Sequence, residues 1–290
     1  MKKQIFVMSI LFLILTHLTY SYNAEHLKAL LTRDNPNIWD NLRKKHPSLK
    51  LDLSHSVIDR VYFRGNFSHV NFRYAKITNS SIAESDFINT DLSYSVIKSL
   101  EGFMPQRPNH VTLNCKNSLF VKSQLLSVKI LFAEFTHVNF TNSKIRDSKI
   151  EASTFINVKF IGAKIINSVF LDKFRDVDFS ATFFYNSLMN AIFITNASFR
   201  NAKIIKSKLY FNNSNNIDFS NSNLSDSSFG WSNLTNVNFT NANLTNVSFI
   251  SPVQYAKPTF HNVIFKNADM TGAKLERKWF DYVKKQGVRN

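Results

Sequence analysis

The sequence of 290 residues contains one cysteine, six glycines and six prolines. A single thiol, Cys115, excludes an intramolecular disulfide framework and any metal site built from several cysteines. Glycine is too scarce for a glycine-rich phosphate-binding loop, and no such loop occurs. Acidic residues are also few, since 20 Asp and Glu stand against 36 Lys and Arg, which gives a formal net charge of +16. Packing and backbone hydrogen bonds must therefore stabilise the fold, and its surface must be basic.

Hydrophobic residues are abundant. They make up 44% of the chain, and 28 of them are phenylalanines. At 33.5 kDa such a chain is long enough to bury a sizeable core. Disorder of the whole chain is therefore excluded.

Residues 1–21, MKKQIFVMSILFLILTHLTYS, have the layout of a secretory signal peptide. Two lysines precede an apolar run from Ile5 to Leu15, and the small residues Thr19 and Ser21 suit a cleavage site. The apolar run is about half of the roughly 20 residues that a membrane-spanning helix needs. We therefore expect cleavage after Ser21, no transmembrane anchor in the mature chain, and a secreted or periplasmic location.

Large apolar residues recur every five positions after residue 50, a period that neither an amphipathic helix nor an alternating strand produces. One series runs from Phe120 to Phe170, and after a single four-residue step another runs from Phe174 to Phe249. We expect the chain to turn a corner every five residues, with one large and one small side chain inside at each corner. Four sides then close a square coil of 20 residues, and stacked coils satisfy each other's backbone groups.

The segments NLTNVNFTNANLTNVSF (233–249) and ADMTGAKL (268–275) carry the pattern most regularly. They resemble the A(D/N)LXX units of the pentapeptide-repeat family in their small residue, their Asn or Asp, and their central Leu or Phe. The resemblance covers about residues 51–275 and implies an all-β solenoid, a right-handed quadrilateral β-helix of about ten coils. The chain departs from the family by using Phe, Ile, Ser and Val where many members carry Leu and Ala.

The two flanks also resemble those of the family, with a short helical lead-in and a terminal helix. We expect an N-terminal helical cap within residues 22–50 and a C-terminal helical cap within 276–290. Trp39 in the first and Trp279 in the second belong to short amphipathic patterns that suit the covering of an open coil end. A rod with such ends is expected to be a monomer or an end-to-end dimer.

The repeat breaks once, at residues 98–114, where two prolines and Gly102 interrupt it. We expect a loop that projects from the rod, with Phe103, Met104 and Arg107 as exposed contacts for recognition. The alternative is a passive bulge or a joint between two stacks of coils.

No catalytic, cofactor-binding or metal-binding constellation emerges from the sequence. Carboxylates 20 residues apart, which should stack, form no pair across successive coils, and the histidines lack the spacing of metal ligands. Cys115 has no histidine partner at a defined spacing and fits a small buried residue. We therefore predict a protein that is not an enzyme and uses no cofactor.

Lysines stand immediately before the central residue of several units, where the side chain should point outward. Lys129 and Lys149 are 20 residues apart, as are Lys144 and Lys164, so each pair should stack. We predict that Lys203 and Lys208 continue these two columns after a gap of one coil. The predicted basic surface comprises Lys129, Lys144, Arg146, Lys149, Lys164, Lys203, Lys206 and Lys208.

Stacked like charges repel, so such columns suit an anionic partner or are screened by solvent alone. The first hypothesis is an exported scaffold that binds a protein or an anionic envelope surface. The second is a secreted effector that engages a host protein through the 98–114 loop. A basic surface without a dedicated partner is the third.

Nucleic acid ranks below these partners, because export removes the chain from the cytoplasm and no interleaving of aromatic and basic residues is evident. The family resemblance also implies a possible topoisomerase-binding role through imitation of duplex DNA. That role belongs to acidic, cytoplasmic rods in what is a largely bacterial family. A basic rod cannot reproduce the potential of a phosphate backbone.

Overall fold

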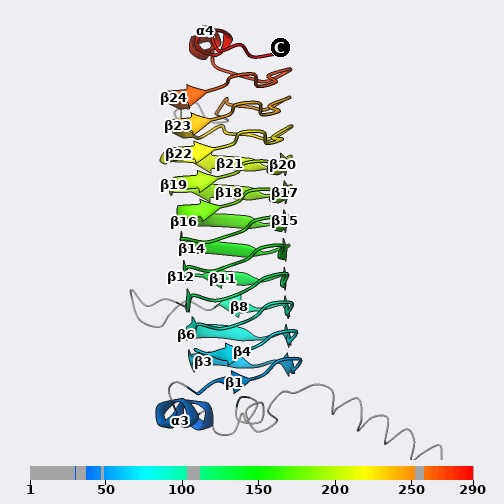
Figure 1. The fold of residues 1–290 in the computed structure, drawn as a ribbon, viewed down its shortest axis with the longest axis vertical. Helices are drawn as coiled ribbons and strands as arrows, with labels where there is room; N and C mark the ends of the chain where they lie inside the picture. The colour runs from blue at the N-terminus through cyan, green and yellow to red at the C-terminus, as the bar shows by residue number, and fades with distance from the viewer. Residues whose placement is uncertain (1–29, 31–36, 47–48, 103–111, 252–257, 290) are drawn as a thin grey trace, which may run out of the picture.

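A computed structural model describes residues 30, 37–46, 49–102, 112–251 and 258–289, and in them the chain winds into a stack of coils (Figure 1). The strands, in chain order, are β1 (Leu51–Asp52), β2 (Val57–Asp59), β3 (Tyr62–Asn66), β4 (Val70–Asn71), β5 (Lys76–Thr78), β6 (Ser81–Ile88), β7 (Val96–Lys98), β8 (Glu101–Gly102), β9 (Leu113–Lys116), β10 (Gln124–Leu126), β11 (Lys129–Leu131), β12 (Ala133–Thr136), β13 (Lys144–Arg146), β14 (Lys149–Ile156), β15 (Lys164–Ile166), β16 (Val169–Asp178), β17 (Phe183–Tyr185), β18 (Leu188–Ala191), β19 (Phe193–Ser198), β20 (Lys203–Ile205), β21 (Lys208–Phe211), β22 (Ser214–Asp218), β23 (Asn233–Asn238) and β24 (Thr259–Ile264). The predicted signal peptide, 1–21, and the predicted loop contacts Phe103, Met104 and Arg107 lie outside the described residues.

The strand pairings of the described residues are parallel and join each coil to the next. Four residues of one coil pair with the next coil: Asn139 with Lys159, Lys144 with Lys164, Lys149 with Val169, and Thr154 with Lys173. Four ladders five residues apart therefore run along the stack, one on each side of the coil. The predicted all-β solenoid is confirmed, with about nine turns.

Phenylalanine rings stack inside the coils at the spacing of the coils themselves. Phe140 lies 4.9 Å from Phe160, Phe160 lies 4.9 Å from Phe179, and Phe179 lies 4.8 Å from Phe199, all between ring centroids. The column continues through Phe219 and beyond. Because parallel strands lie about 4.8 Å apart, identical rings at identical corners meet in stacked contact. This geometry explains why phenylalanine replaces leucine so often.

The corners use asparagine where many turns use glycine. Most corners hold a residue with positive φ, such as Asn196 (φ 52°) and Asn216 (φ 59°), a conformation that asparagine tolerates better than most residues. The corner amides also bond to one another. Asn216 Nδ2 donates to Asn196 Oδ1 at 3.0 Å, and Asn196 Nδ2 donates to Asp176 Oδ1 at 2.8 Å. These amide ladders reconcile sharp corners with a nearly glycine-free sequence.

A column of buried serines lines another set of corners. The backbone amide of Ser148 donates to Ser168 Oγ at 3.2 Å, and the same bond links Ser168 to Ser187 and Ser187 to Ser207. Each hydroxyl also donates to a carbonyl, as Ser148 Oγ does to Arg146 O at 2.8 Å. The small inward residue therefore satisfies backbone groups that would otherwise be buried without partners.

Helix α3 (Asn37–Lys45) covers the first coil. The ring of Trp39 stacks on Phe67 at 4.8 Å, and Trp39 Nε1 donates to Asn66 O at 3.1 Å. Arg43 is buried beside it and donates to the carbonyls of Leu49 and Ser68. Burial lowers the pKa of Arg43. The guanidinium thus binds carbonyls that the end of the stack leaves exposed.

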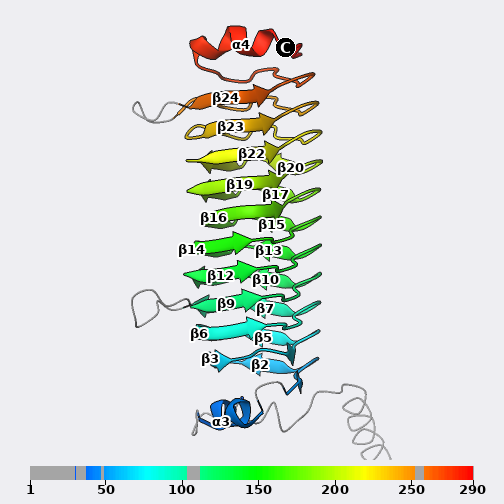
Figure 2. The same ribbon diagram turned by 60° about the vertical axis from the view of Figure 1, so that its left-hand side comes forward.

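The other end is covered by the 3₁₀ helix η1 (Arg277–Trp279) and helix α4 (Phe280–Lys284), as Figure 2 shows. Trp279 stacks on Phe260 at 4.7 Å. Tyr282 Oη donates to Val263 O at 2.7 Å and accepts from Val263 N at 3.1 Å. Of the helices in the described ranges, none is long and apolar enough to cross a membrane.

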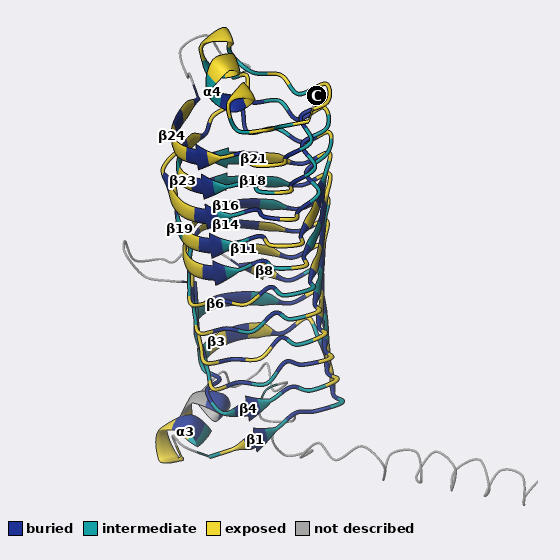
Figure 3. Cartoon of the chain, turned by 45° about the horizontal axis from the view of Figure 1, so that its top comes forward, coloured by how far each residue is buried: buried dark blue, intermediate teal, exposed yellow. Residues whose placement is uncertain are grey.

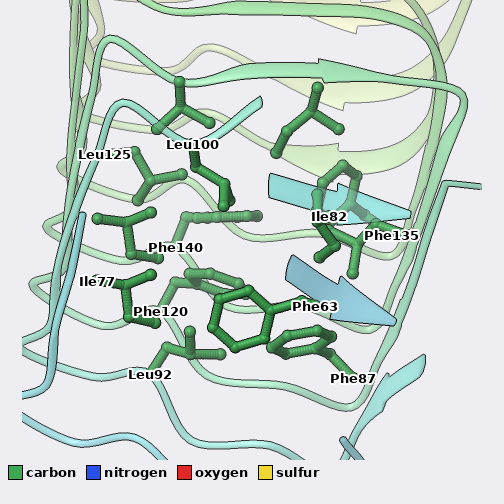
Figure 4. Close-up of a pocket in the computed structure, with 14 residues that line it drawn as sticks. Phe63, Ile77, Ile82, Phe87, Leu92, Leu100, Phe120, Leu125, Phe135 and Phe140 are labelled. Atoms are coloured by element: carbon green, nitrogen blue, oxygen red, sulfur yellow. The ribbon is translucent and has the colours of Figure 1, made fainter. Parts of the chain in front are cut away.

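The interruption of the repeat is narrower than the predicted loop at 98–114. Strand β8 ends at Gly102, and the ladder resumes by Thr112, which donates its backbone amide to Phe132 O. Gly102 and Cys115 both occupy core positions that hold large side chains in the neighbouring coils, where Ile82 aligns with Gly102 and Phe87 with Cys115. An apolar cavity of about 30 Å³ lies in this part of the core (Figure 4).

Candidate functional site

The first lysine column follows one side of the coil. Lys144 on β13 pairs in register with Lys164 on β15, Lys164 pairs with Phe183 on β17, and Phe183 pairs with Lys203 on β20. The residue after each of them on its strand is buried. Figure 3 shows the same alternation of buried and less buried residues along the labelled strands. One coil, carrying Phe183, therefore separates Lys203 from the two stacked lysines.

The second column follows the adjacent side, where Figure 1 labels β8, β11, β18 and β21 one above another. Lys129 on β11 pairs with Lys149 on β14, followed by Val169 on β16, Leu188 on β18 and Lys208 on β21. The gap before Lys208 is thus two coils rather than the predicted one. The spacing from Lys149 to Lys208 covers three coil lengths, one of them shortened by the four-residue step, so two coils intervene.

Arg146 and Lys206 lie at the corner between these two sides. Arg146 ends β13 and pairs with Asp147 at 3.1 Å, while Lys206 occupies a corner with φ 50°. Lys149 pairs with Glu151 at 2.8 Å. Among the described residues, the other predicted members of the basic surface make no ion pair. Those members are Lys129, Lys144, Lys164, Lys203, Lys206 and Lys208.

Several carboxylates on another side of the coil are engaged by their own turns. Asp91, Asp178 and Asp218 each accept a hydrogen bond from the backbone amide two residues on, at 2.8 to 2.9 Å. Asp91 and Asp218 also pair with arginines, at 3.1 and 3.3 Å. These carboxylates form turns on another side of the coil and do not pair with the lysine columns, in which Lys149 alone makes an ion pair within the described residues.

One aromatic side chain of the first column contacts a lysine of the next coil. Lys203 Nζ lies 5.8 Å from the ring centroid of Phe183, within cation–π distance. The contact was missed because Phe183 and Lys203 are adjacent only across coils. Their separation of 20 residues, one coil length, is the signal in the sequence that indicates the contact.

A second mixed cluster follows the corner at His55, Tyr74 and Tyr94. Successive rings lie 4.7 and 4.9 Å apart and are stacked, and the Arg73 guanidinium lies 5.3 Å from the Tyr94 ring. The rings cover one another's faces. The cluster therefore stabilises the corner rather than offering flat faces to a ligand.

The two most perturbed titratable groups lie in the core. Burial raises the pKa of the Cys115 thiol to about 12, so it is protonated and a poor nucleophile at neutral pH. Burial also raises the pKa of Asp172, whose Oδ1 accepts from Ser153 N at 2.8 Å. In the part of the chain that the structure describes, no three His, Cys, Asp or Glu side chains gather as a metal site would require.

Comparison with known proteins places the repeat in a family. The family model for pentapeptide repeats matches residues 215–249, with eight copies of the repeat. No curated protein matches the chain.

Solved structures with a similar fold include two repeat proteins. The chain is 16% identical to a trypsin-treated QnrB1, a plasmid-mediated fluoroquinolone resistance protein, with 81% of this chain and 100% of that chain covered and a TM-score of 0.43. It is 12% identical to HetL, a protein involved in heterocyst differentiation regulation from the cyanobacterium Nostoc sp. strain PCC 7120, with 80% and 95% covered and a TM-score of 0.27. Both TM-scores are below 0.5, so the assignment rests on the repeat match and the observed coil.

Proposed function

The chain is a pentapeptide-repeat protein, and we propose that it is an exported, non-enzymatic scaffold whose lysine columns bind an anionic surface. The observation that carries the proposal is the stacking of Lys144 on Lys164, continued by Lys203, on one flat side of the rod. None of the three makes an ion pair within the described residues.

Electrostatics supports this role. Two unit charges about 4.8 Å apart repel by on the order of 1 kcal/mol in water, and salt screens the interaction. A partner that places negative groups along the column removes this repulsion and adds attraction. The rigid stack holds the lysine backbones at one spacing, so little conformational freedom is lost on binding.

A binding role is favoured over catalysis by where the perturbed groups lie. The Cys115 thiol and the Asp172 carboxyl are buried in the core, whereas an acid, base or nucleophile must reach its substrate. The export part of the proposal is supported by the sequence of residues 1–21. A secreted or periplasmic location would expose the lysines to anionic envelope components or to an acidic protein.

Recognition through residues 98–114 is a second candidate. The observation in its favour is that the ladder of described residues stops at Gly102 and resumes at Thr112, so that Asp86 pairs with Asn114, 28 residues on, where neighbouring coils pair residues 19 or 20 apart. The DNA-mimic role of acidic family members is not proposed, because the net charge here is +16.

The test uses the mature chain, starting at Tyr22, and dextran sulfate as a polyanion probe. In the column variant, Lys144, Lys164 and Lys203 are changed to Gln. In the matched control, Lys116, Lys159 and Lys266, exposed on other parts of the coil, are changed to Gln. We expect the column variant to lose about fivefold in affinity per lysine at low salt, a loss that shrinks as salt rises.

Equal losses in the two variants would show that net charge alone, and not the column, drives binding. Deleting residues 103–111 distinguishes recognition through the loop from binding by the lysine columns. Loss of a protein partner with unchanged dextran sulfate binding would favour the loop.

A further inference from the structure

The lysine columns are interrupted by outward apolar residues at one level of the rod. Val169 and Leu171 on β16 and Leu188 on β18 alternate with buried Phe170 and Met189, so their side chains point outward, where they are half-buried. Val169 pairs in register with Leu188. A side of the coil that carries lysines elsewhere is therefore apolar here.

Exposed apolar side chains extend this level past the two corners that bound this side. Tyr185, which ends β17 on the preceding side, is 37% exposed. Ile192, in the turn after β18, and Phe193, which begins β19 on the following side, are 44% and 48% exposed. Val169, Leu171, Tyr185, Leu188, Ile192 and Phe193 are called the apolar band below. Apart from Val169 and Leu171 on the coil before, its members follow one another along β17, β18 and β19 of a single coil.

Basic residues flank the band along the rod. Lys149 pairs in register with Val169 on one flank, and Lys208 pairs with Leu188 on the other. Figure 1 shows β14, β16, β18 and β21 above one another on this side. The corner beside the band adds Lys206, which shares the strand-to-strand turn between β20 and β21.

The acidic groups near the band are few, and each is paired, hydrogen-bonded or buried. Glu151 pairs with Lys149, and Asp147 pairs with Arg146. Asp176 accepts the amide of Asn196, and Asp226 accepts that of Asn246. Asp172 is buried beneath the band. The flanks of the band therefore retain a net positive charge.

We propose that this side of the rod lies on an anionic lipid bilayer, with the apolar band at the boundary between headgroups and acyl chains and the lysines on headgroup phosphates. This inference rests on the proposed function and names its partner. Charge complementarity selects anionic headgroups, and the band selects an apolar layer beneath them. A sulfated or phosphorylated polymer can bind the lysines but offers no apolar environment for the band. A bilayer interface supplies both anionic groups and an apolar environment within roughly 5 to 10 Å of depth.

The flat geometry suits this partner. Val169, Leu171 and Leu188 lie on the side of the second lysine column, and Tyr185 and Ile192 lie next to the two corners that bound it, so a partner that covers this side and its corners contacts the band together with Lys149 and Lys208. Tyrosine and phenylalanine at the edges match the amphipathic side chains that favour membrane interfaces.

The experiment measures co-sedimentation of the mature chain with phosphatidylcholine vesicles, with and without phosphatidylglycerol, and its binding to dextran sulfate. The band variant is Ile192→Ser with Phe193→Ser. The matched control is Val57→Ser with Ile264→Ser, two exposed apolar residues on other parts of the rod. The charge variant is Lys149→Gln with Lys208→Gln. Circular dichroism and the thermal midpoint verify that each variant is folded.

We expect the wild-type chain to bind vesicles only when phosphatidylglycerol is present. The band variant should lose at least tenfold in vesicle binding and keep its dextran sulfate binding, whereas the charge variant should lose both. A Phe193→Trp variant should be quenched by brominated lipids, which reports insertion directly.

Dextran sulfate binding without vesicle binding would overturn the lipid inference and leave the proposed function intact. A wild-type chain that binds neither dextran sulfate nor vesicles would overturn the lipid inference and the proposed function. Vesicle binding by the band variant equal to that of the wild type, or capture of an acidic protein with no vesicle binding, would also overturn the inference.

Discussion

The carboxyl of Asp172 accepts a hydrogen bond at 2.8 Å from the backbone amide of Ser153 on the preceding coil. In the serine column the same bond is made to a hydroxyl, as Ser148 N makes it to Ser168 Oγ. Asp172 stands at the four-residue step, where the register of β14 with β16 shifts between Glu151 and Thr154. Its other oxygen, Oδ2, has no hydrogen-bond partner. One corner of the stack thus holds a carboxyl where neighbouring corners hold a small hydroxyl.

This carboxyl should make stability depend on pH. Burial raises the pKa of Asp172 in the folded protein above its ordinary value of 3.8, so the folded state holds the proton more tightly than the unfolded state. Its contribution to stability is therefore fully present below the unfolded pKa of about 3.9 and is lost as pH rises through the folded pKa. Asp172→Ser should abolish this component and raise the free energy of unfolding at pH 8 by about 1–3 kcal/mol. Urea unfolding at pH 4.5 and pH 8 measures it, and equal pH dependence in the two proteins would contradict it.

The apolar cavity lined in part by Phe87 and Phe135 should accept a larger side chain at position 115. Cys115 is aligned with Phe87 and Phe135, so its thiol replaces a ring in that column. Cys115→Leu should raise the free energy of unfolding by about 1 kcal/mol, since each buried methylene contributes roughly 0.8 kcal/mol. The matched change Phe155→Cys, in a filled coil, should lower it by about 3–5 kcal/mol. Chemical denaturation measures both, and destabilisation by Cys115→Leu would show that the core cannot use this space.

The native thiol should resist alkylation. Its pKa of about 12 leaves almost no thiolate at pH 8, and the side chain is fully buried. Iodoacetamide should therefore modify Cys115 only in denaturant, as mass spectrometry would detect. Rapid labelling of the folded chain at pH 8 would mean that this coil opens readily.

The corner amides should contribute measurably to stability. Asn196→Ala removes the amide that donates to Asp176 and accepts from Asn216, and it leaves alanine at a positive φ. We therefore expect the free energy of unfolding to fall by about 1–2 kcal/mol. Asn196→Gly loses the same bonds without the strain and should lose less. Thermal unfolding distinguishes the two variants, and an equal loss would assign the whole effect to the hydrogen bonds.

The C-terminal cap should depend on one hydroxyl. Tyr282 Oη bonds both the amide and the carbonyl of Val263; Tyr282→Phe leaves the amide without this partner, whereas the carbonyl keeps the bond from Gln286 Nε2 at 3.1 Å. We expect a loss of about 1–3 kcal/mol in the free energy of unfolding. Phe280→Ser, at an exposed position of the same helix, is the control and should change stability little. Hydrogen exchange at Val263 locates the effect.

The five-residue period was sufficient to predict the fold, because each large residue marks a side of the coil and four sides close it. It did not predict contacts between coils. Lys208 was placed one coil too close to Lys149, since one coil is shortened by the four-residue step and the register must be followed through it. The contact of Lys203 with Phe183 was missed because the two residues are adjacent only across coils.

The polar ladders were missed for a different reason. The sequence shows that small residues recur before large ones, but not that Ser148 and Ser168 exchange bonds with backbone groups. Asn196 carries no local signal that its amide contacts residues 20 positions away. Volume and turn preference are readable from neighbouring residues, whereas hydrogen-bond partners across coils are readable only once the register is known.

The parallel ladders join each coil only to the one before and the one after it. No pairing in the described residues has to wait for a distant part of the sequence to arrive. A chain that emerges N-terminus first can therefore pack its first coil against Trp39 and Arg43 of helix α3. Each completed coil can then serve as the template for the next. Assembly in that order has a direction, and each added coil makes backward slippage of the emerging chain less favourable.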